Sequence, residues 1–266
     1  MQSHEVQAVL ERADRHAALP RLGGMARPTG VVVVSERFWA FAGADGVLRG
    51  GEMPHPPALV RRLPLLRGLG RLALSVAPLL KSGGAASRRE RVLILAALVL
   101  PFALVALPSV WQLTIGIGLT AALLCVLLRG RALSFHGAEH RAIAAAETRS
   151  LGSAWDGSSL PSRFSPRCGT NFAAIAMPLA FGVQSSWPLA PALWTPFVVT
   201  SLSLAVSMEI WRKVQAAERG PLKLLLLPGL GLQRLTTREP RIAETRVALT
   251  AVASVLRREL AVATDS

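Results

Sequence analysis

The sequence has 266 residues, of which 51% are apolar, and its 30 Lys and Arg against 16 Asp and Glu give a formal net charge of +14 at pH 7. Nucleic-acid-binding proteins and membrane proteins both reach such a charge, so the distribution of the cations decides between them. Here the arginines gather at the edges of long apolar blocks, and the chain has no Tyr. This pattern argues against a basic groove for phosphates and favours a membrane protein.

The two cysteines are not expected to form a disulfide framework. Cys125 lies in an apolar block and Cys168 in an arginine-flanked stretch, which suits a reducing, cytosol-facing location. Residues 1–20 carry charges throughout and lack the apolar core of a cleavable signal peptide. Insertion into a membrane would therefore use internal segments.

The N-terminal segment, residues 1–60, is expected to be a cytoplasmic unit with a small β-hairpin. Its stretch VVVVSERFWAFAGADGVLRGG has β-branched and aromatic residues around an Ala-Asp-Gly turn. Such residues favour strands, which we expect near 31–34, 38–42 and 46–49.

Residues 61–90 are expected to contain an amphipathic helix that lies in the membrane interface. Over 64–82, at about 100° per residue, Arg67, Arg71 and Lys81 lie on one side and most of the leucines on the other. Such a helix can place its cations at the level of the headgroups. A helix packed on the rest of the fold explains the pattern equally well.

Two pairs of apolar segments predict an all-α polytopic membrane protein with about four transmembrane helices in two hairpins, besides the small N-terminal β-hairpin element and interfacial helices. The first pair, 91–128, has spans at 92–108 and 110–128, and the second, 171–211, has spans near 172–186 and 191–210. Arginines flank the outer ends of both pairs. The positive-inside rule places both termini and segment 129–170 on the cytoplasmic side of the cell (inner) membrane.

The C-terminal segment, residues 212–266, is expected on the same side. Its stretch KLLLLPGLGLQRLTTREP is too short and too interrupted to span a bilayer. We expect a re-entrant or interfacial piece there, followed by a cytoplasmic helix over 241–262. All the polar stretches that can do chemistry would then lie on one side of the membrane.

The stretch FHGAEH, residues 135–140, places two histidines and a glutamate in an expected helix over 133–147. His136 and His140 are i and i+4, about 6 Å apart along the axis and close to the same face. A single helix chelates a divalent metal with this spacing. Glu139 can be a third ligand, a general base or a partner that orients an imidazole. Structural or solvated histidines are the plainer alternative.

Cys168, in SPRCGTNF, is expected just before the third apolar segment, at the depth of the two histidines. Its thiolate, flanked by Arg167, can complete a His/His/Cys metal set or act as a nucleophile. A small residue that begins a helix is the alternative interpretation.

Two more glutamates are candidate catalytic residues. Glu147 shares the face of His136 but lies about 16 Å further along the helix, which suits a salt bridge or a substrate contact. Glu209 lies near the cytoplasmic end of the fourth apolar segment, where an ionisable side chain indicates function. Pairing with Arg212 at i+3 is the alternative.

Three motifs together resemble the YqhQ-like family of bacterial membrane proteins, a family of unknown function described as predicted metal-dependent enzymes. The motifs are HGAEH at 136–140, with Glu147 also fitting, RCGT at 167–170, and PGLGLQRLTTREP at 228–240. The opening GGMARPTGVVVV is similar to the family's GGQAVxEGVMM. The resemblance covers nearly the whole chain from about residue 22 and identifies it as a divergent member.

The chain departs from the family pattern at three polar positions. The family's histidine three residues before the cysteine is Ser165, the glutamate of the opening motif is Thr29, and the acidic stretch after LTTREP retains only Glu244. The resemblance therefore implies a metal role only for the four site residues His136, Glu139, His140 and Cys168.

Gln233, Arg234 and Glu239, in QRLTTREP, are candidate cofactor-binding residues. Thr236 or Thr237 can cap the helix expected after them, and Glu239 in its first turn would favour the helix dipole. Capping does not explain Gln233. We therefore expect Gln233, Arg234 and Glu239 to line a pocket with the histidines.

Two functions follow from these motifs. The first is a metal-dependent hydrolase with a divalent metal, zinc being expected, that activates water at the cytoplasmic membrane face to attack a membrane-associated substrate. The alternative is a non-enzymatic membrane scaffold or assembly factor with a structural or vestigial metal site; a transporter is a weaker third choice. Expected partners are the lipid bilayer, a membrane-associated substrate or partner protein, and a second copy of the chain, but no nucleic acid.

Overall fold

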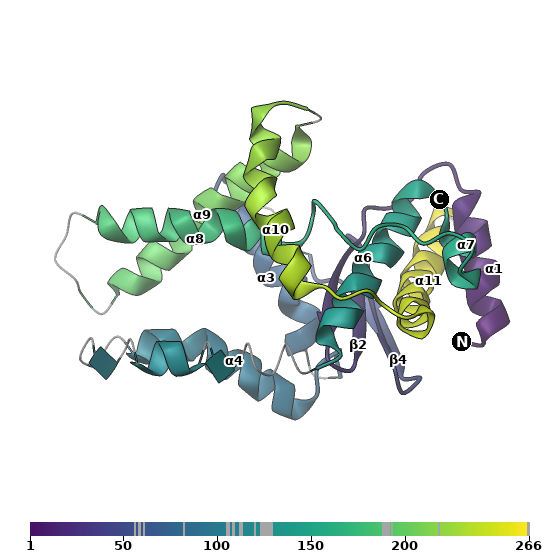
Figure 1. The fold of residues 1–266 in the computed structure, drawn as a ribbon, viewed down its shortest axis with the longest axis horizontal. Coiled ribbons are helices and arrows are strands. Elements are labelled where there is room, and N and C mark those ends of the chain that lie inside the picture. The colour runs from purple at the N-terminus through teal and green to yellow at the C-terminus, as the bar shows by residue number, and fades with distance from the viewer. Residues whose placement is uncertain are drawn as a thin grey trace.

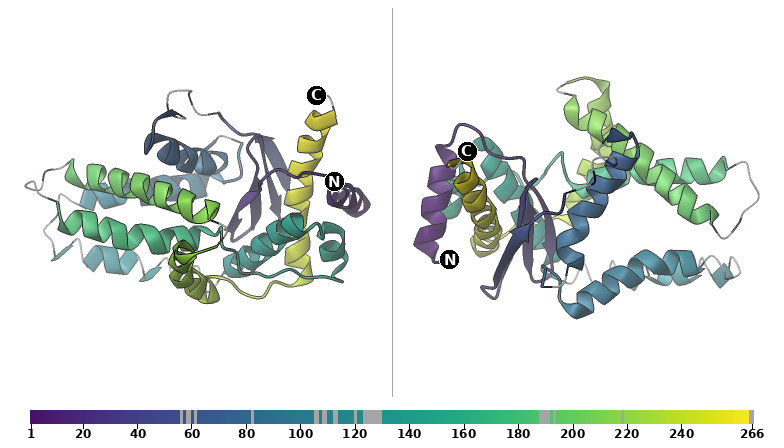
Figure 2. Two further views of the ribbon diagram at one scale, coloured as in Figure 1. Left: turned by 90° about the horizontal axis from the view of Figure 1, so that it is seen from above. Right: turned by 180° about the vertical axis from the view of Figure 1, so that it is seen from behind.

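The computed structural model describes residues 1–55, 57, 60, 62–81, 83–104, 107, 110–111, 114–119, 121–122, 130–187, 192, 194–217 and 219–264. In this part of the chain, a β-sheet lies between two groups of helices (Figures 1 and 2).

The sheet is an antiparallel meander with the strand order β1-β2-β3-β4. The strands are β1 (Gly23–Arg27), β2 (Gly30–Val34), β3 (Phe38–Gly43) and β4 (Leu48–Glu52). The expected strands correspond to β2, β3 and β4. The sequence interpretation missed β1, because its residues GGMAR include no β-branched or aromatic side chain.

Successive side chains of the central strands pack on opposite faces of the sheet, as the two-residue period of a strand requires. Val31 and Val33 of β2 belong to the larger core, and Val32 belongs to a smaller core with Trp39 and Phe41 of β3. The sheet is therefore buried on both faces, which explains why β2 is a continuous run of valines.

Four helices build the larger core on one face: α1 (Ser3–Asp14), α6 (Ala132–Thr148), α7 (Leu151–Asp156) and α11 (Ile242–Thr264). α6 packs on β1, α11 packs on β2 and β3, and α1 packs on α11 and α7. The helices expected over 133–147 and 241–262 correspond to α6 and α11. This packing brings α6, which carries both histidines, against the first strand.

The other helices are α3 (Leu66–Leu80), α4 (Arg88–Leu104), α8 (Gly169–Ser185), α9 (Thr195–Ala216), the 3-10 helix η1 (Pro221–Leu226) and α10 (Leu227–Thr236). Leu79 of α3 reaches the smaller core, and α3 also packs on α9. α8 packs on α9 and α10. α4 and the α8–α9 pair extend away from the sheet in the same general direction (Figure 1).

The prediction of an all-α polytopic membrane protein is wrong. The fold contains a four-stranded antiparallel sheet. None of the helices in the described ranges combines the length with the apolar character needed to cross a bilayer. A window of sequence counts apolar residues, whereas the structure shows where each helix begins and ends.

The individual helices give the physical reasons for this correction. α8 has 17 residues, about 25 Å of helix against a hydrocarbon core of about 30 Å. The described part of α4, Arg88–Leu104, begins with the charged residues RRER. α9 has 22 residues, but its last turns carry Glu209, Arg212 and Lys213. The span expected at 110–128, with Cys125, lies partly outside the described residues.

Candidate metal centre

The two histidines of FHGAEH lie on neighbouring turns of α6, with their ring centroids 4.4 Å apart. Nδ1 of His136 lies 2.7 Å from the carbonyl oxygen of Thr236, and Nδ1 of His140 lies 2.6 Å from that of Arg163. Because a carbonyl oxygen can only accept, each Nδ1 carries the hydrogen, and Nε2 of the neutral ring presents a lone pair. Metal-binding histidines are oriented in this way by their outer partners.

Cys168 reaches the histidines from the start of α8. It is the N-cap residue, and its Sγ accepts a hydrogen bond of 3.3 Å from the backbone N–H of Thr170. Its Sγ also lies 3.2 Å from Nε2 of His136, and the side chain is buried and free of any disulfide. The α8 N-terminus therefore points the sulfur at the lone pair of His136.

One donor atom from each of His136, His140 and Cys168 lies within 4.8 Å of the other two. A single ion with bonds of about 2.0–2.3 Å holds its ligands roughly 3–4 Å apart, so small side-chain adjustments close this set around an ion. Two imidazole nitrogens and a sulfur are the donors that zinc and other borderline metals prefer. The residues present therefore fit a divalent metal.

Glu139 lies beside this cluster and points toward β1. Its carboxylate is 3.9 Å from Nε2 of His140, and a Cβ placed on Gly24 would lie only 2.7 Å from Oε1 of Glu139. Burial raises the pKa of Glu139 to about 7, while the nearby His136 acts in the opposite direction. The carboxyl group can therefore gain or lose a proton near neutral pH.

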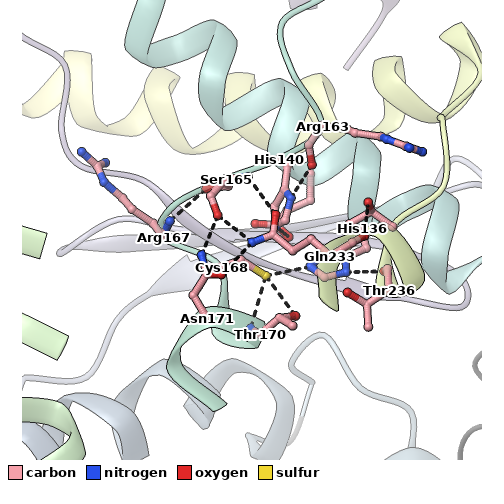
Figure 3. Close-up of polar contacts among 12 residues, drawn as sticks. His136, His140, Arg163, Ser165, Arg167, Cys168, Thr170, Asn171, Gln233 and Thr236 are labelled. Carbon is pink, nitrogen blue, oxygen red and sulfur yellow. Dashed lines mark hydrogen bonds and ion pairs between the residues drawn. The ribbon is translucent and has the colours of Figure 1, made fainter. Parts of the chain in front are cut away.

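A cavity of about 770 Å³ opens onto these residues. Glu139 lines it together with His136, His140 and Cys168, the three residues called the triad below (Figure 3). Its apolar wall is formed by Leu22, Met25, Ala26, Ala132, Leu133, Ile143, Leu232 and Leu235. A ligand in this cavity would contact polar, titratable groups at one place and apolar side chains elsewhere, as in many enzyme sites.

Gly137 allows the chain after α10 to approach α6 closely. A Cβ at this position would overlap the carbonyl oxygen of Arg238, whose own N–H donates to the carbonyl of Leu133 at 3.0 Å. This approach places the carbonyl of Thr236 against His136. The glycine that lowers the helix propensity of FHGAEH thus makes room for the segment that orients the ring.

Gln233 does not line the cavity but supports the loop that carries Cys168. Its side chain is fully buried and hydrogen-bonds both backbone groups of Ser165, as well as Oδ1 of Asn171 at 3.2 Å. Figure 3 shows this network beside the triad. The expected pocket residue is therefore a support of the loop that carries Cys168.

The structure places the other sequence candidates away from the triad. Arg234 is exposed, and Glu239 pairs with Arg141 and lies 3.7 Å from Nε of Arg163. Neither of them lines the cavity. Glu239 instead bridges the segment after α10 to α6 and to the loop before Cys168.

The two distant glutamates form ion pairs. Glu147 pairs with Arg167 at the outer end of α6. Glu209 of α9 accepts two hydrogen bonds from Arg67 of α3, of 2.8 and 2.7 Å, and one of 2.9 Å from Arg212. These hydrogen bonds, that of Arg67 first, lower the pKa of Glu209 to about 2. Glu209 therefore connects two helices as a carboxylate.

The sequence interpretation did not find the groups that orient the histidines. The carbonyls of Thr236 and Arg163 and the space left by Gly24 depend on segments far apart in the chain. The only sequence signals for these groups were the motifs themselves, because Gly24 lies in the opening motif and Thr236 lies in LTTREP. Ser165 lines the cavity, and Thr29 lies in the turn after β1.

Comparison with known proteins places the chain in a family. Residues 91–258 match the family described as "Protein of unknown function (DUF1385)". The chain is 31% identical over 160 residues to the "Uncharacterized protein YqhQ" of Bacillus subtilis (strain 168), which covers 58% of this chain and 50% of that protein. The chain thus matches about half the length of that curated relative. No solved structure matches this chain. The resemblance found in the motifs is confirmed, and the chain belongs to the DUF1385 family as a divergent, YqhQ-like member.

Proposed function

We propose that the protein is a metal-dependent hydrolase whose divalent ion, most simply zinc, is held by His136, His140 and Cys168. The observation that carries the proposal is the convergence of their three donor atoms within 4.8 Å, with both Nδ1 atoms engaged by backbone carbonyls. Catalytic zinc sites have three protein ligands and one position for water or substrate, whereas structural sites have four protein ligands. The donor set therefore supports a catalytic site better than a structural one.

The metal would supply a Lewis acid at the cavity wall and make water more acidic there. Glu139 would take up the proton from water and return it to the leaving group, because a buried carboxyl group with a pKa of about 7 can do both near neutral pH. The carbonyls of Thr236 and Arg163 would keep both Nε2 atoms turned toward the ion. Gly24 would leave the carboxyl group the space it needs.

We also propose that the substrate is membrane-associated and that the protein works at a membrane. Two side chains of the cavity wall, Leu232 and Leu235, are also exposed on the surface of α10, Leu235 to 69%. Exposed apolar side chains continue on the helices that pack against α10: Leu222, Leu224 and Leu225 of η1, and Met177 and Phe181 of α8. This gathering of exposed apolar side chains on helices that pack together supports a surface for lipid or for apolar partners.

The test is hydrolysis of a panel of p-nitrophenyl carboxylic and phosphate esters by protein loaded with zinc, manganese or iron. We expect activity that a chelator removes and the metal restores. Glu139→Gln should keep the metal and lower kcat by at least about 100-fold, as expected for loss of a general base. Glu209→Gln, outside the cavity, is the matched carboxylate control and should keep full activity.

Two results would contradict this proposal. Retained metal without hydrolysis of any ester would favour a scaffold or assembly factor with a structural metal site. Hydrolysis that is equal in the wild type and in Glu139→Gln would remove the proposed role of Glu139.

A further inference from the structure

A second cavity, of about 280 Å³, lies next to the cavity of the triad. Leu22, Ile143 and Arg167 line both cavities, so the two adjoin at these side chains. Nothing in the proposed hydrolytic chemistry uses this outer cavity. Its lining includes residues 19–22 before β1 and Ala146, Glu147 and Arg149 at the end of α6.

The outer cavity has an excess of positive charge. Arg21, Arg149 and Arg167 line it, and Glu147 is the one carboxylate among the described residues that do so. Arg149 donates to the carbonyls of Ala13 at 3.3 Å and Ala17 at 3.2 Å, and among the described residues no carboxylate forms an ion pair with it. The cavity therefore favours an anion.

The pair formed by Arg167 and Glu147 can be exchanged for a pair with a ligand. The side chain of Arg167 is 45% exposed and that of Glu147 is 44% exposed. An ion pair with this exposure contributes only about 0–1 kcal/mol, so a ligand anion with better geometry displaces Glu147 at little cost. Arg167 can therefore pair with a phosphate or carboxylate of a ligand, and until then Glu147 is its weakly bound partner.

Part of the apolar wall of the first cavity comes from α10. Figure 3 shows Arg167 extending away from Cys168 on one side and Thr236, at the end of α10, on the opposite side. α10 contributes Leu232 and Leu235 to the cavity. Glu147, which marks the anion site, is seven residues beyond His140 on α6, or about 10 Å along the helix axis.

We propose that the joined cavities bind an anionic amphiphile, a molecule with a phosphate or carboxylate head and an apolar chain. The head pairs with Arg167 in place of Glu147, with Arg21 and Arg149 adding positive potential. The chain passes the triad and lies against Leu232 and Leu235. This inference deepens the proposed function, on which it rests for the ligand being the substrate, but the binding itself requires no metal.

Isothermal titration calorimetry with n-octyl phosphate tests the proposal, on protein as purified and after dialysis against a chelator. We expect Arg167→Gln to weaken binding about tenfold, which corresponds to about 1.4 kcal/mol. Glu147→Gln should strengthen binding several-fold, because Arg167 no longer has an internal partner. Arg257→Gln, an exposed cation on α11, is the matched control and should bind as the wild type does.

Inorganic phosphate and 1-octanol separate the contributions of the head and the chain. Each should bind the wild type at least about tenfold more weakly than octyl phosphate does. Inorganic phosphate that binds as tightly as octyl phosphate would show a site for free phosphate and overturn the amphiphile. A wild type that binds no octyl phosphate at millimolar concentration would overturn the site altogether.

Equal affinities in the wild type, Arg167→Gln and Glu147→Gln would also overturn the proposal. If circular dichroism shows that Arg167→Gln does not fold, Glu147→Gln decides alone. Failure of the hydrolase proposal is separate: protein that binds no metal, yet binds octyl phosphate through Arg167, keeps the anion site and loses the metal site. Protein that binds metal, but binds octyl phosphate equally well with and without Arg167, keeps the metal site and loses the anion site.

Discussion

The side-chain amide of Gln233 forms hydrogen bonds with both backbone polar groups of Ser165. Its Oε1 accepts from the Ser165 N–H at 2.9 Å, and its Nε2 donates to the Ser165 carbonyl at 2.8 Å. The side chain of Gln233 is fully buried, and it joins α10 to the loop that, three residues later, presents Cys168. The position of the candidate sulfur ligand therefore depends on a side chain that does not itself face the cavity.

Replacing Gln233 should weaken metal binding without removing a ligand. Gln233→Ala removes the acceptor of the Ser165 N–H and one of the donors to the Ser165 carbonyl, which still accepts from Nδ2 of Asn171 at 2.9 Å. Loss of these bonds should lower the free energy of unfolding by about 1–3 kcal/mol. The looser loop should lower zinc affinity about 10–100-fold, the usual effect of losing an outer partner of a metal ligand. Competition with a chromophoric zinc chelator measures the affinity.

Gln215→Ala is the matched control for this prediction. Gln215 is half-buried and donates an exposed hydrogen bond of 3.0 Å to the carbonyl of Pro166 in the same loop. We expect a clearly smaller loss of zinc affinity, because water can replace an exposed partner. Equal losses in both variants would contradict the special role of Gln233.

A methyl group at Gly24 should disturb Glu139. In Gly24→Ala the new Cβ would lie 2.7 Å from both Cγ and Oε1 of Glu139, so the carboxyl group must move. We expect destabilisation of about 1–3 kcal/mol, as for other overpacked sites, measured by urea unfolding. Gly23→Ala meets only Cγ2 of Val34 at 3.5 Å and should be close to neutral.

The double variant Gly24→Ala/Glu139→Ala supplies the second check. If the overlap with Glu139 causes the destabilisation, Gly24→Ala should have little effect once Glu139 is shortened. An undiminished effect in that background would place the cause elsewhere in β1.

Metal-free protein should lose stability as the pH rises toward 7. The pKa of Glu139 is about 7 in the folded chain and has an ordinary value of 4.5 in the unfolded chain. The folded state therefore binds more protons between these values, and its free energy of unfolding falls across this range, by on the order of 3 kcal/mol. Urea unfolding at pH 5 and pH 8 measures the change.

Glu139→Gln should remove this pH dependence, because an amide does not titrate. The exposed Glu36→Gln should keep it. The same fall in stability in the wild type and in Glu139→Gln would assign the effect to another group.

The Arg67–Glu209 pair should stabilise the protein except in acid. The pKa of Glu209 is lowered to about 2 from 4.5, mainly by its hydrogen bond with Arg67. The contribution of the carboxylate is therefore present above pH 4.5 and is lost as the pH falls toward 2. Glu209→Gln should be less stable than the wild type by on the order of 1 kcal/mol at pH 6, for a partly exposed pair, and by much less at pH 2. A difference that does not change with pH would contradict the ion pair.

Local patterns predicted individual elements and the centre of the site, although not the fold class. The β-branched and aromatic residues indicated the strands β2 and β3, and the Ala-rich stretch around His140 indicated α6. The i, i+4 spacing of His136 and His140 fixed their shared face, since it depends only on helix geometry. The motif around Cys168 added a third donor, whose place beside His136 only the folded chain reveals.

Local patterns wrongly predicted membrane spans, and they did not place the outer site residues. Apolar composition did not reveal that α8 ends after 17 residues. Nor did it reveal that Glu209 of α9 forms an ion pair with Arg67 of α3. The roles of Gln233 and Gly24 come from contacts between segments more than 60 residues apart, from Gln233 to Ser165 and from Gly24 to Glu139. Periodicity within one segment carries no information about such contacts.

The central claim is that His136, His140 and Cys168 bind one metal ion, and the most direct test is the metal content of purified protein by inductively coupled plasma mass spectrometry. We expect about one equivalent of zinc or another transition metal in the wild type and in the surface control His4→Ala/His55→Ala. His136→Ala/His140→Ala and Cys168→Ser should lose the metal while circular dichroism shows the fold retained. A wild type that holds no metal after incubation with zinc, manganese or iron, or a triad variant that holds as much as the wild type, would show that these three residues are not a metal site.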